Sequence, residues 1–271
     1  MCNPEFVTAS YMCISIFMKK LLITSGCSFS ECRTSAKTWP RYLAKVLPEY
    51  EHKSYAMGSQ GNGLISRSTI YGVSEALKTH DPKDILVGVM WSGSNRHDFR
   101  YTEPNLLHFV SENINNGWME NPTGFVNDTT KNWVILNTNW AENNKEAETY
   151  YKMFHDDIGS SIYSIEHILR TQWFLQSKNI KYFFTNYMDY NIVAPDYITH
   201  PEISYLYKEI NTDYYLPISS QYSWITQNSK HIETHPGKWE SRTGPHHPCA
   251  EMHEEFVDEC IVPWLREKKY I

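Results

Sequence analysis

The chain has 271 residues, 41% of them hydrophobic, and a formal net charge of −6. This length suits one large α/β domain or two small ones. The acidic balance, with no basic cluster, argues against nucleic-acid binding through the phosphate backbone. The six cysteines lack the paired spacing of metal sites and are too sparse for a disulfide scaffold, so we expect free thiols in a reducing, cytoplasmic compartment.

The first seventeen residues look foreign to the fold that follows. They lack the basic region that begins a signal peptide, and their apolar part is far short of the ~20 residues that span a bilayer. We therefore expect residues 1–17 to be an N-terminal extension, from an upstream start codon or an added arm, with an unusual secretion signal as the alternative. Residues 18–271 are expected to form one domain, and no membrane association is expected.

The most informative segment lies at the start of that domain. An apolar run, residues 21–24, stops at Gly26, Cys27 and Ser28, as buried parallel strands do when they end in a turn. Ligands of open α/β sheets bind outside the carboxyl ends of the strands, so Ser28 stands where a nucleophile would stand. The alternative is that Ser28 caps the next helix, in a capping box completed by Glu31.

Strands and helices then alternate along the chain. Further strands are predicted at 52–57, 84–91 and 181–187, and helices at 38–47, 62–79, 159–177, 201–210 and 250–266. The helix at 159–177 has a predicted buried stripe of apolar residues: Ile162, Ile165, Ile168, Leu169, Trp173 and Phe174. This alternation predicts a three-layer α/β/α sandwich with a central parallel sheet.

The segment 97–157 breaks the alternation and is read as an insertion. It is rich in asparagine, and because it directly follows the turn at Asn95 we expect it to lie over the mouth of a site there. Amide groups and exposed indoles suit sugars, so four tryptophans become candidate substrate-binding residues: Trp91, Trp118, Trp133 and Trp140. The alternative is a small subdomain in which the tryptophans form the core.

Three later segments follow strand ends or precede the last helix. They are residues 56–63 (AMGSQGNG), residues 92–96 (SGSNR) and residues 244–249 (GPHHPC). With the Ser28 turn, and in this order, they resemble the four blocks of the SGNH (GDSL-like) hydrolase superfamily. The resemblance spans Lys19 to about Leu265 and implies that superfamily's flavodoxin-like α/β/α fold.

The resemblance also implies a role for each of four residues. Ser28 is the nucleophile, and its backbone N–H is one donor of the oxyanion hole; Gly58 adds a second N–H, Asn95 adds its side-chain amide, and His247 is the general base. A serine hydroxyl needs such a base to become nucleophilic, and a tetrahedral intermediate needs such donors. Taken alone, Gly58 fits an ordinary turn and Asn95 a helix cap or surface turn.

Two positions depart from the family pattern. Cys27 replaces the usual Asp of the first block, and Gly244 stands where the family has an Asp three residues before the catalytic His. Without that acid, His247 must be oriented by a backbone carbonyl or by another carboxylate; three are candidates: Glu240, Glu251 and Asp98. His247 is preferred to His246 because it directly precedes Pro248, as in the family.

The sequence thus predicts a serine esterase that removes an acyl group, such as acetyl, from a small-molecule or carbohydrate ester. No metal or other cofactor is expected; the alternative is a zinc site at His231 and His235, which would share a face if helical. One alternative is a catalytically weakened glycan-binding module of the same fold, which the missing Asp favours. Another is a flavodoxin-like nucleotide binder, with Gly58 and Gly61 cradling phosphate.

Overall fold

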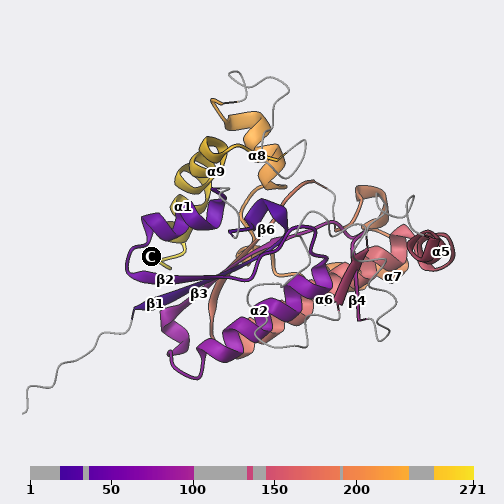
Figure 1. Ribbon diagram of the computed structural model, residues 1–271, viewed down its shortest axis with the longest axis horizontal. Coiled ribbons are helices and arrows are strands. Elements are labelled where there is room, and N and C mark those ends of the chain that lie inside the picture. The colour runs from indigo at the N-terminus through magenta and orange to yellow at the C-terminus, as the bar shows by residue number, and fades with distance from the viewer. Residues whose placement is uncertain (1–18, 33–36, 101–132, 137–144, 190–191, 232–246) are drawn as a thin grey trace, which may run out of the picture.

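The computed structural model describes residues 19–32, 37–100, 133–136, 145–189, 192–231 and 247–271 (Figure 1). Its centre is a parallel sheet of four strands: β1 (Lys20–Ser25), β2 (Tyr50–Ser54), β3 (Ile85–Trp91) and β6 (Lys181–Asn186). The strand order is β2-β1-β3-β6, and each neighbouring pair is parallel. The four predicted strands are therefore confirmed, although β2 begins two residues earlier and ends three residues earlier than predicted.

The two faces of the sheet bury alternate residues of the same strands. Ile23, Val87 and Phe184 belong to one buried cluster, whereas Leu22, Leu86 and Phe183 belong to the other. This follows from the two-residue period of a strand, which sends successive side chains to opposite faces. Strands buried on both faces read as continuous apolar runs, which is why the sequence revealed them.

Helices cover both faces of the sheet (Figure 1). On the face of Ile23 lie α2 (Asn62–Ala76), α6 (Asp157–Ser177) and α7 (Pro201–Tyr207), with α2 against α6 and α6 against α7. On the other face lie α1 (Trp39–Val46) and α9 (Ala250–Phe256), followed by a π-helical turn (Val257–Ile261) and α10 (Val262–Glu267). The arrangement is consistent with a three-layer α/β/α sandwich.

Shorter elements complete the described part of the chain. Single turns of 3-10 helix lie at Ser28–Ser30, Pro82–Asp84, Pro195–Tyr197 and Thr212–Tyr214, and α8 (Gln221–Asn228) precedes the C-terminal helices. Within the predicted insertion, β4 (His97–Arg100) pairs antiparallel with β5 (Trp133–Leu136), and α5 (Lys145–Phe154) follows. Residues 1–18 and the insertion's residues 101–132 and 137–144 lie outside the described residues.

One predicted core position is wrong. Trp173 was placed in the buried stripe of α6, but 52% of its surface is exposed. The buried residues of this helix are spaced three or four apart and include Ile165, Ile168, Gln172 and Leu175. Trp173 is one position past Gln172 and so turns away from the sheet. The buried stripe therefore contains the polar Gln172, whereas the neighbouring apolar Trp173 is exposed.

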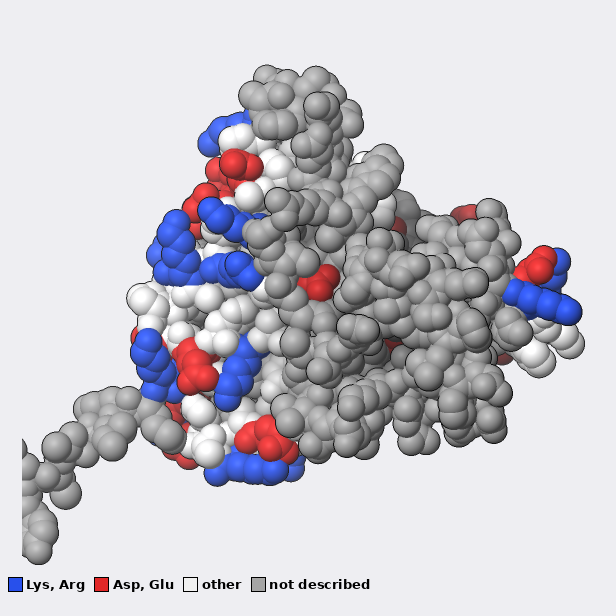
Figure 2. Space-filling model, in the orientation of Figure 1, with Lys and Arg blue, Asp and Glu red and all other residues white. Residues whose placement is uncertain are grey.

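The described surface shows charges of both signs. On the face drawn in Figure 2, lysine and arginine side chains lie close to aspartate and glutamate side chains. Ion pairs of the described surface include Lys45 with Glu254 and Lys78 with Glu75. None of the helices in the described ranges is long and apolar enough to cross a membrane.

The packing around Gly88 generates a stability prediction. A Cβ atom at Gly88 would lie 2.6 Å from Cζ of Phe183 and 3.1 Å from Cη2 of Trp39, and both side chains are fully buried. Gly88→Ala is expected to lower the free energy of unfolding by about 1–3 kcal/mol, because overpacking strains a core. Urea denaturation measures this change. Ser74→Ala, on the exposed side of α2, is the control and should change stability by less than about 0.5 kcal/mol. A Gly88→Ala protein as stable as the unmodified one would contradict the packing described.

Candidate active site

A tight turn after β1 positions Ser28. Gly26 has a φ of 157°, and a Cβ there would lie 2.5 Å from Oγ of Ser30. A glycine is needed because other residues rarely adopt this φ and would collide with Ser30. The turn ends the strand and starts a short 3-10 helix at Ser28, at the carboxyl end of β1. Ser28 is therefore held at the sheet edge that the sequence predicted.

The structure brings Ser28 and His247 into hydrogen-bonding contact. Oγ of Ser28 lies 2.7 Å from Nε2 of His247, although 219 residues separate the two in sequence. The ring of Phe29 packs against the imidazole of His247 with 4.7 Å between centroids. This is the relation of a nucleophile to its general base, in which the ring nitrogen can take the hydroxyl proton.

The capping-box alternative for Ser28 is wrong. No side chain caps the 3-10 helix that begins at Ser28, and the Ser28 hydroxyl contacts His247. The Glu31 carboxylate instead accepts a hydrogen bond from the backbone N–H of Gly58, at 3.0 Å. Sequence reasoning missed this contact, because the position of Glu31, three residues after Ser28, fits a capping box.

Gly58 lies in the loop after β2, beside the Ser28 turn. The backbone N–H of Met57 donates to the carbonyl of Gly26 at 3.2 Å, which ties the loop after β2 to the turn after β1. The N–H of Gly58 itself is engaged by Glu31. In this arrangement the proposed oxyanion donor already has an acceptor.

Asn95 lies at the carboxyl end of β3, in a turn closed by the N–H of Arg96 and the carbonyl of Gly93. A Cβ at Gly93 would lie 2.7 Å from Oδ1 of Asn95 and 3.4 Å from the hydroxyl of Tyr187. The Tyr187 ring in turn meets the Phe29 ring edge to face, with 5.0 Å between centroids. Asn95 and Tyr187 thus both lie beside Gly93, and Tyr187, which also packs on Phe29 of the Ser28 turn, is a residue that sequence reasoning missed. The rule that ligand sites lie at strand ends would have found it, since Tyr187 directly follows β6.

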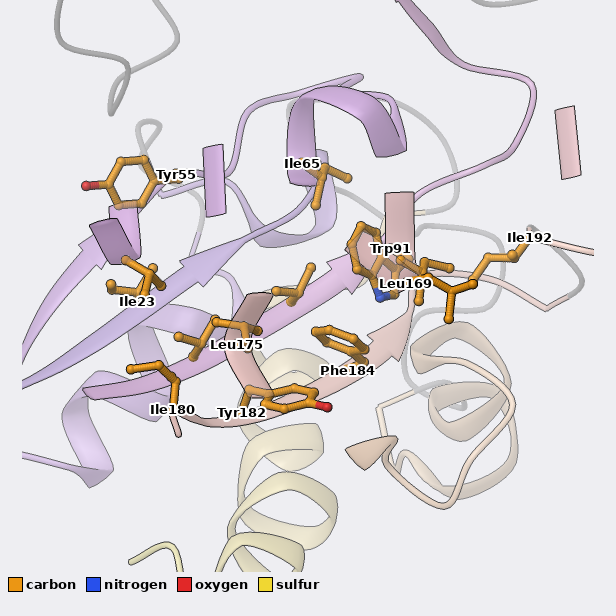
Figure 3. Packing of buried hydrophobic residues seen from close by; sticks show 14 of the residues in the cluster. Ile23, Tyr55, Ile65, Trp91, Leu169, Leu175, Ile180, Tyr182, Phe184 and Ile192 are labelled. Atoms are coloured by element: carbon orange, nitrogen blue, oxygen red, sulfur yellow. The ribbon is translucent and has the colours of Figure 1, made fainter. Parts of the chain in front are cut away.

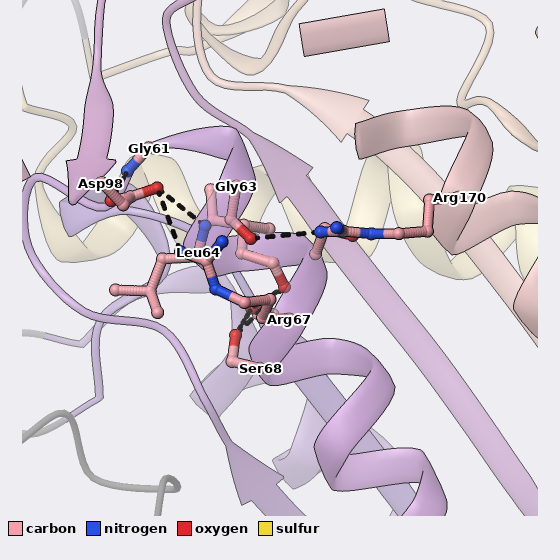
Figure 4. A network of polar contacts seen from close by, with 10 residues as sticks. Gly61, Gly63, Leu64, Arg67, Ser68, Asp98 and Arg170 are labelled. Carbon is pink, nitrogen blue, oxygen red and sulfur yellow. Dashed lines mark hydrogen bonds and ion pairs between the residues drawn. The ribbon is translucent and has the colours of Figure 1, made fainter. Parts of the chain in front are cut away.

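Asp98 is not the acid that orients His247. Its buried carboxylate accepts hydrogen bonds from the N–H groups of Gly61 at 3.2 Å and Leu64 at 2.8 Å, at the start of α2 (Figure 4). Arg67 lies 4.0 Å away. Burial raises the pKa of Asp98, and Arg67 and the two N–H groups oppose that shift. A carboxylate in this position stabilises the positive end of the helix dipole.

The other candidate acids stay predictions. Glu240, together with Gly244 and His246, lies outside the described residues. Glu251 is in the first turn of α9, two residues after Cys249, and its carboxylate interacts with that thiol.

Trp91 cannot contact a substrate, which corrects its assignment. It is fully buried and meets the ring of Phe184 edge to face, in the cluster beneath α2 and α6 (Figure 3). Trp91 is the last residue of β3, and the two-residue period of the strand turns its side chain into the core. Trp118 and Trp140 lie outside the described residues. Trp133 is in β5, where its backbone pairs with Arg100.

Other described histidine and cysteine side chains with possible chemistry are buried or contact residues outside the Ser28–His247 pair. His253 is buried on α9, and its Nδ1 lies 2.9 Å from Nε2 of Gln221. Cys27 is fully buried. His231 lies 3.5 Å from Glu255, and His235 is outside the described ranges. Within those ranges, no group of three or more His, Cys, Asp or Glu residues could hold a metal ion.

Comparison with known proteins identifies no relative: no protein-family model, no curated protein and no solved structure matches the chain.

The buried His253 generates a pH prediction. Burial lowers its pKa to about 3, and nearby His247 contributes. In the unfolded chain a histidine titrates near ~6.5, so between about pH 6.5 and pH 3 the unfolded state binds more protons and stability falls as the pH falls. At pH 5 the loss from His253 alone should be about 2 kcal/mol relative to pH 7. Denaturant unfolding at both pH values measures it, and His253→Asn should make the dependence shallower. An equally steep dependence in that variant would contradict the assignment.

Proposed function

We propose that the protein is a serine esterase of the SGNH type, acting on an ester of a polar small molecule or carbohydrate. The observation that carries the proposal is the 2.7 Å contact between Oγ of Ser28 and Nε2 of His247. It joins the end of β1 to the segment before α9. The two residues were selected from separate sequence blocks, so their contact supports the resemblance that selected them.

The chemistry would proceed by two acyl transfers. Nε2 of His247 takes the Ser28 proton as Oγ attacks the ester carbonyl carbon, and the resulting tetrahedral intermediate collapses to an acyl-serine. The alcohol leaves with the proton held by His247. A water molecule, deprotonated by the same nitrogen, then attacks the acyl-serine, and the carboxylic acid departs as Ser28 regains its proton.

The negative oxygen of each intermediate needs preorganised donors. The proposal assigns this role to the N–H of Ser28 and the amide of Asn95. Gly58 could contribute its N–H only when the Glu31 carboxylate releases or shares it. Catalysis would then depend on a small shift of Glu31 as substrate binds.

The substrate assignment draws on the insertion after Asn95. β4 begins two residues after Asn95, so the insertion leaves the sheet at the proposed site. Its asparagine and tryptophan content suits a sugar or another polar ring. An acetyl ester of such a molecule is the substrate class that we propose.

A glycan-binding module without catalysis is the second candidate. The Glu31 carboxylate favours this non-catalytic candidate, because the carboxylate already accepts the hydrogen bond of the Gly58 N–H. Cys27 and Gly244, which depart from the catalytic pattern, favour it also. Hydrolysis of a simple acetyl ester separates the two candidates, since the module would bind sugars and release no acid.

Replacing the nucleophile is the direct test. Ser28→Ala should abolish ester hydrolysis and labelling by a fluorophosphonate probe, because both need the Ser28 oxygen. Release of p-nitrophenol from its acetate measures the first, and mass spectrometry of the labelled peptide measures the second.

Ser74→Ala is the matched control, since Ser74 is an exposed serine on α2. It should keep both activities. Circular dichroism should show that Ser28→Ala is folded. Undiminished hydrolysis by Ser28→Ala would refute the assignment of the nucleophile.

Glu31→Gln tests the engaged oxyanion donor. Glutamine can still accept from Gly58, but the variant removes the negative charge that opposes an oxyanion nearby. We expect a higher kcat for p-nitrophenyl acetate. Glu254→Gln, on the far side of α9 beside Lys45, should leave kcat unchanged. An equal or lower kcat in Glu31→Gln would show that the carboxylate does not restrain the site.

A further inference from the structure

Arg96 directly follows Asn95 and has a fixed position at the same edge of the sheet. Its Nη1 donates to Oγ of Ser92 at 2.8 Å. Its guanidinium group also lies over the ring of Tyr187, 5.1 Å from the centroid. Two contacts of this kind hold the side chain in one orientation, which lowers the entropy lost when it binds a ligand.

A continuous row of rings connects Arg96 to the Ser28–His247 pair. Tyr187, which bears the guanidinium on its ring, touches Phe29. Phe29 touches His247, and His247 contacts Ser28. Arg96 is therefore connected to His247 through the rings of Tyr187 and Phe29, at the same edge of the sheet as the proposed nucleophile.

The guanidinium retains donors for a ligand. It has five N–H donors, and among the described residues only Ser92 accepts from it. The side chain as a whole is only partly buried. An incoming anion can thus meet it without disturbing the contacts that fix it.

The charges around Arg96 favour an anion. Burial raises the pKa of Asp98, and the positive charges of Arg67 and Arg96 both act to lower it. Burial lowers the pKa of Arg170, and the nearby charge of Arg67 lowers it further. Arg96 and Arg67 thus act on the Asp98 carboxylate, and Arg170 lies next to Arg67. His97 and His167 add no negative charge, and burial keeps them neutral, with pKa values of about 4. In a chain of net charge −6, this is a local excess of positive charge.

We propose that Arg96 binds an anionic group of the substrate, so that the ester hydrolysed at Ser28 belongs to a molecule that also bears a carboxylate or a phosphate. The inference rests on the proposed esterase function. A guanidinium group suits both anions, since its parallel N–H groups match two oxygens of either one. Arg96 then selects the substrate, and Ser28 and His247 carry out the reaction.

Three matched acetyl esters test the proposal: methyl 4-acetoxybenzoate, which is neutral, 4-acetoxybenzoate, and 4-acetoxyphenyl phosphate. The unmodified protein should show a higher kcat/KM for at least one anionic ester than for the neutral one, and the better anion identifies the group. Arg96→Gln should reduce that preference about 10-fold or more, chiefly through KM, because it removes a charged hydrogen bond. Arg96→Lys should retain part of it.

Arg266→Gln is the control, because Arg266 is an exposed arginine on α10. It should keep the full preference. The preference should also decline as salt is raised, which checks the role of charge even if Arg96→Gln proves unstable. An unmodified protein without preference for either anionic ester, or an Arg96→Gln variant with the full preference, would overturn the inference.

A separate measurement distinguishes failure of the inference from failure of the proposed function. If the unmodified protein hydrolyses none of the three esters, the esterase proposal fails. Calorimetric titration with 4-hydroxybenzoate and with inorganic phosphate then tests Arg96 alone. Binding that Arg96→Gln loses and Arg266→Gln keeps would support the anion site. Binding absent from the unmodified protein, or unchanged in Arg96→Gln, would overturn it.

Discussion

The turn at Gly26 is the constraint on which the proposed site depends. Its backbone conformation and its close approach to Ser30 allow no side chain, so β1 must end there and the chain must turn sharply into Ser28. The carbonyl of Gly26 also accepts from Met57, which draws in the loop after β2. One glycine thus fixes both the serine and the segment that contains Gly58, and the parallel sheet supplies the edge at which they meet.

The strands and most helices could be predicted because their patterns are local. A strand buried on both faces is apolar throughout, and β3 shows this over all seven residues. The placement of Ser28 followed from the same rule. The contact with His247 came from resemblance to a family pattern, since no local signal links residues 219 positions apart. No such pattern identified an acid to orient His247, because Gly244 stands where the family has its Asp.

The errors have a common physical cause. Trp91 and Trp173 were interpreted from the chemistry of their side chains and Glu31 from its spacing, whereas the surroundings of each residue decide its role. Trp91 ends a strand but faces the core, and Trp173 is apolar but faces solvent. Glu31 has the spacing of a capping box but bonds to Gly58, in a loop 27 residues away. Side-chain direction depends on register within an element, which composition and spacing determine only to within one residue.

The turn after β3 shows how neighbouring charges acquire different roles. Arg96 and Asp98 are two residues apart, yet Asp98 is turned into the protein, where N–H groups of α2 and Arg67 balance its charge. The hydrogen bonds that it accepts hold this turn against the start of α2. Because Asp98 is satisfied by these partners, it does not neutralise Arg96 through a direct ion pair. The guanidinium is instead directed over Tyr187, so the acid that anchors the turn leaves the adjacent base available to a ligand.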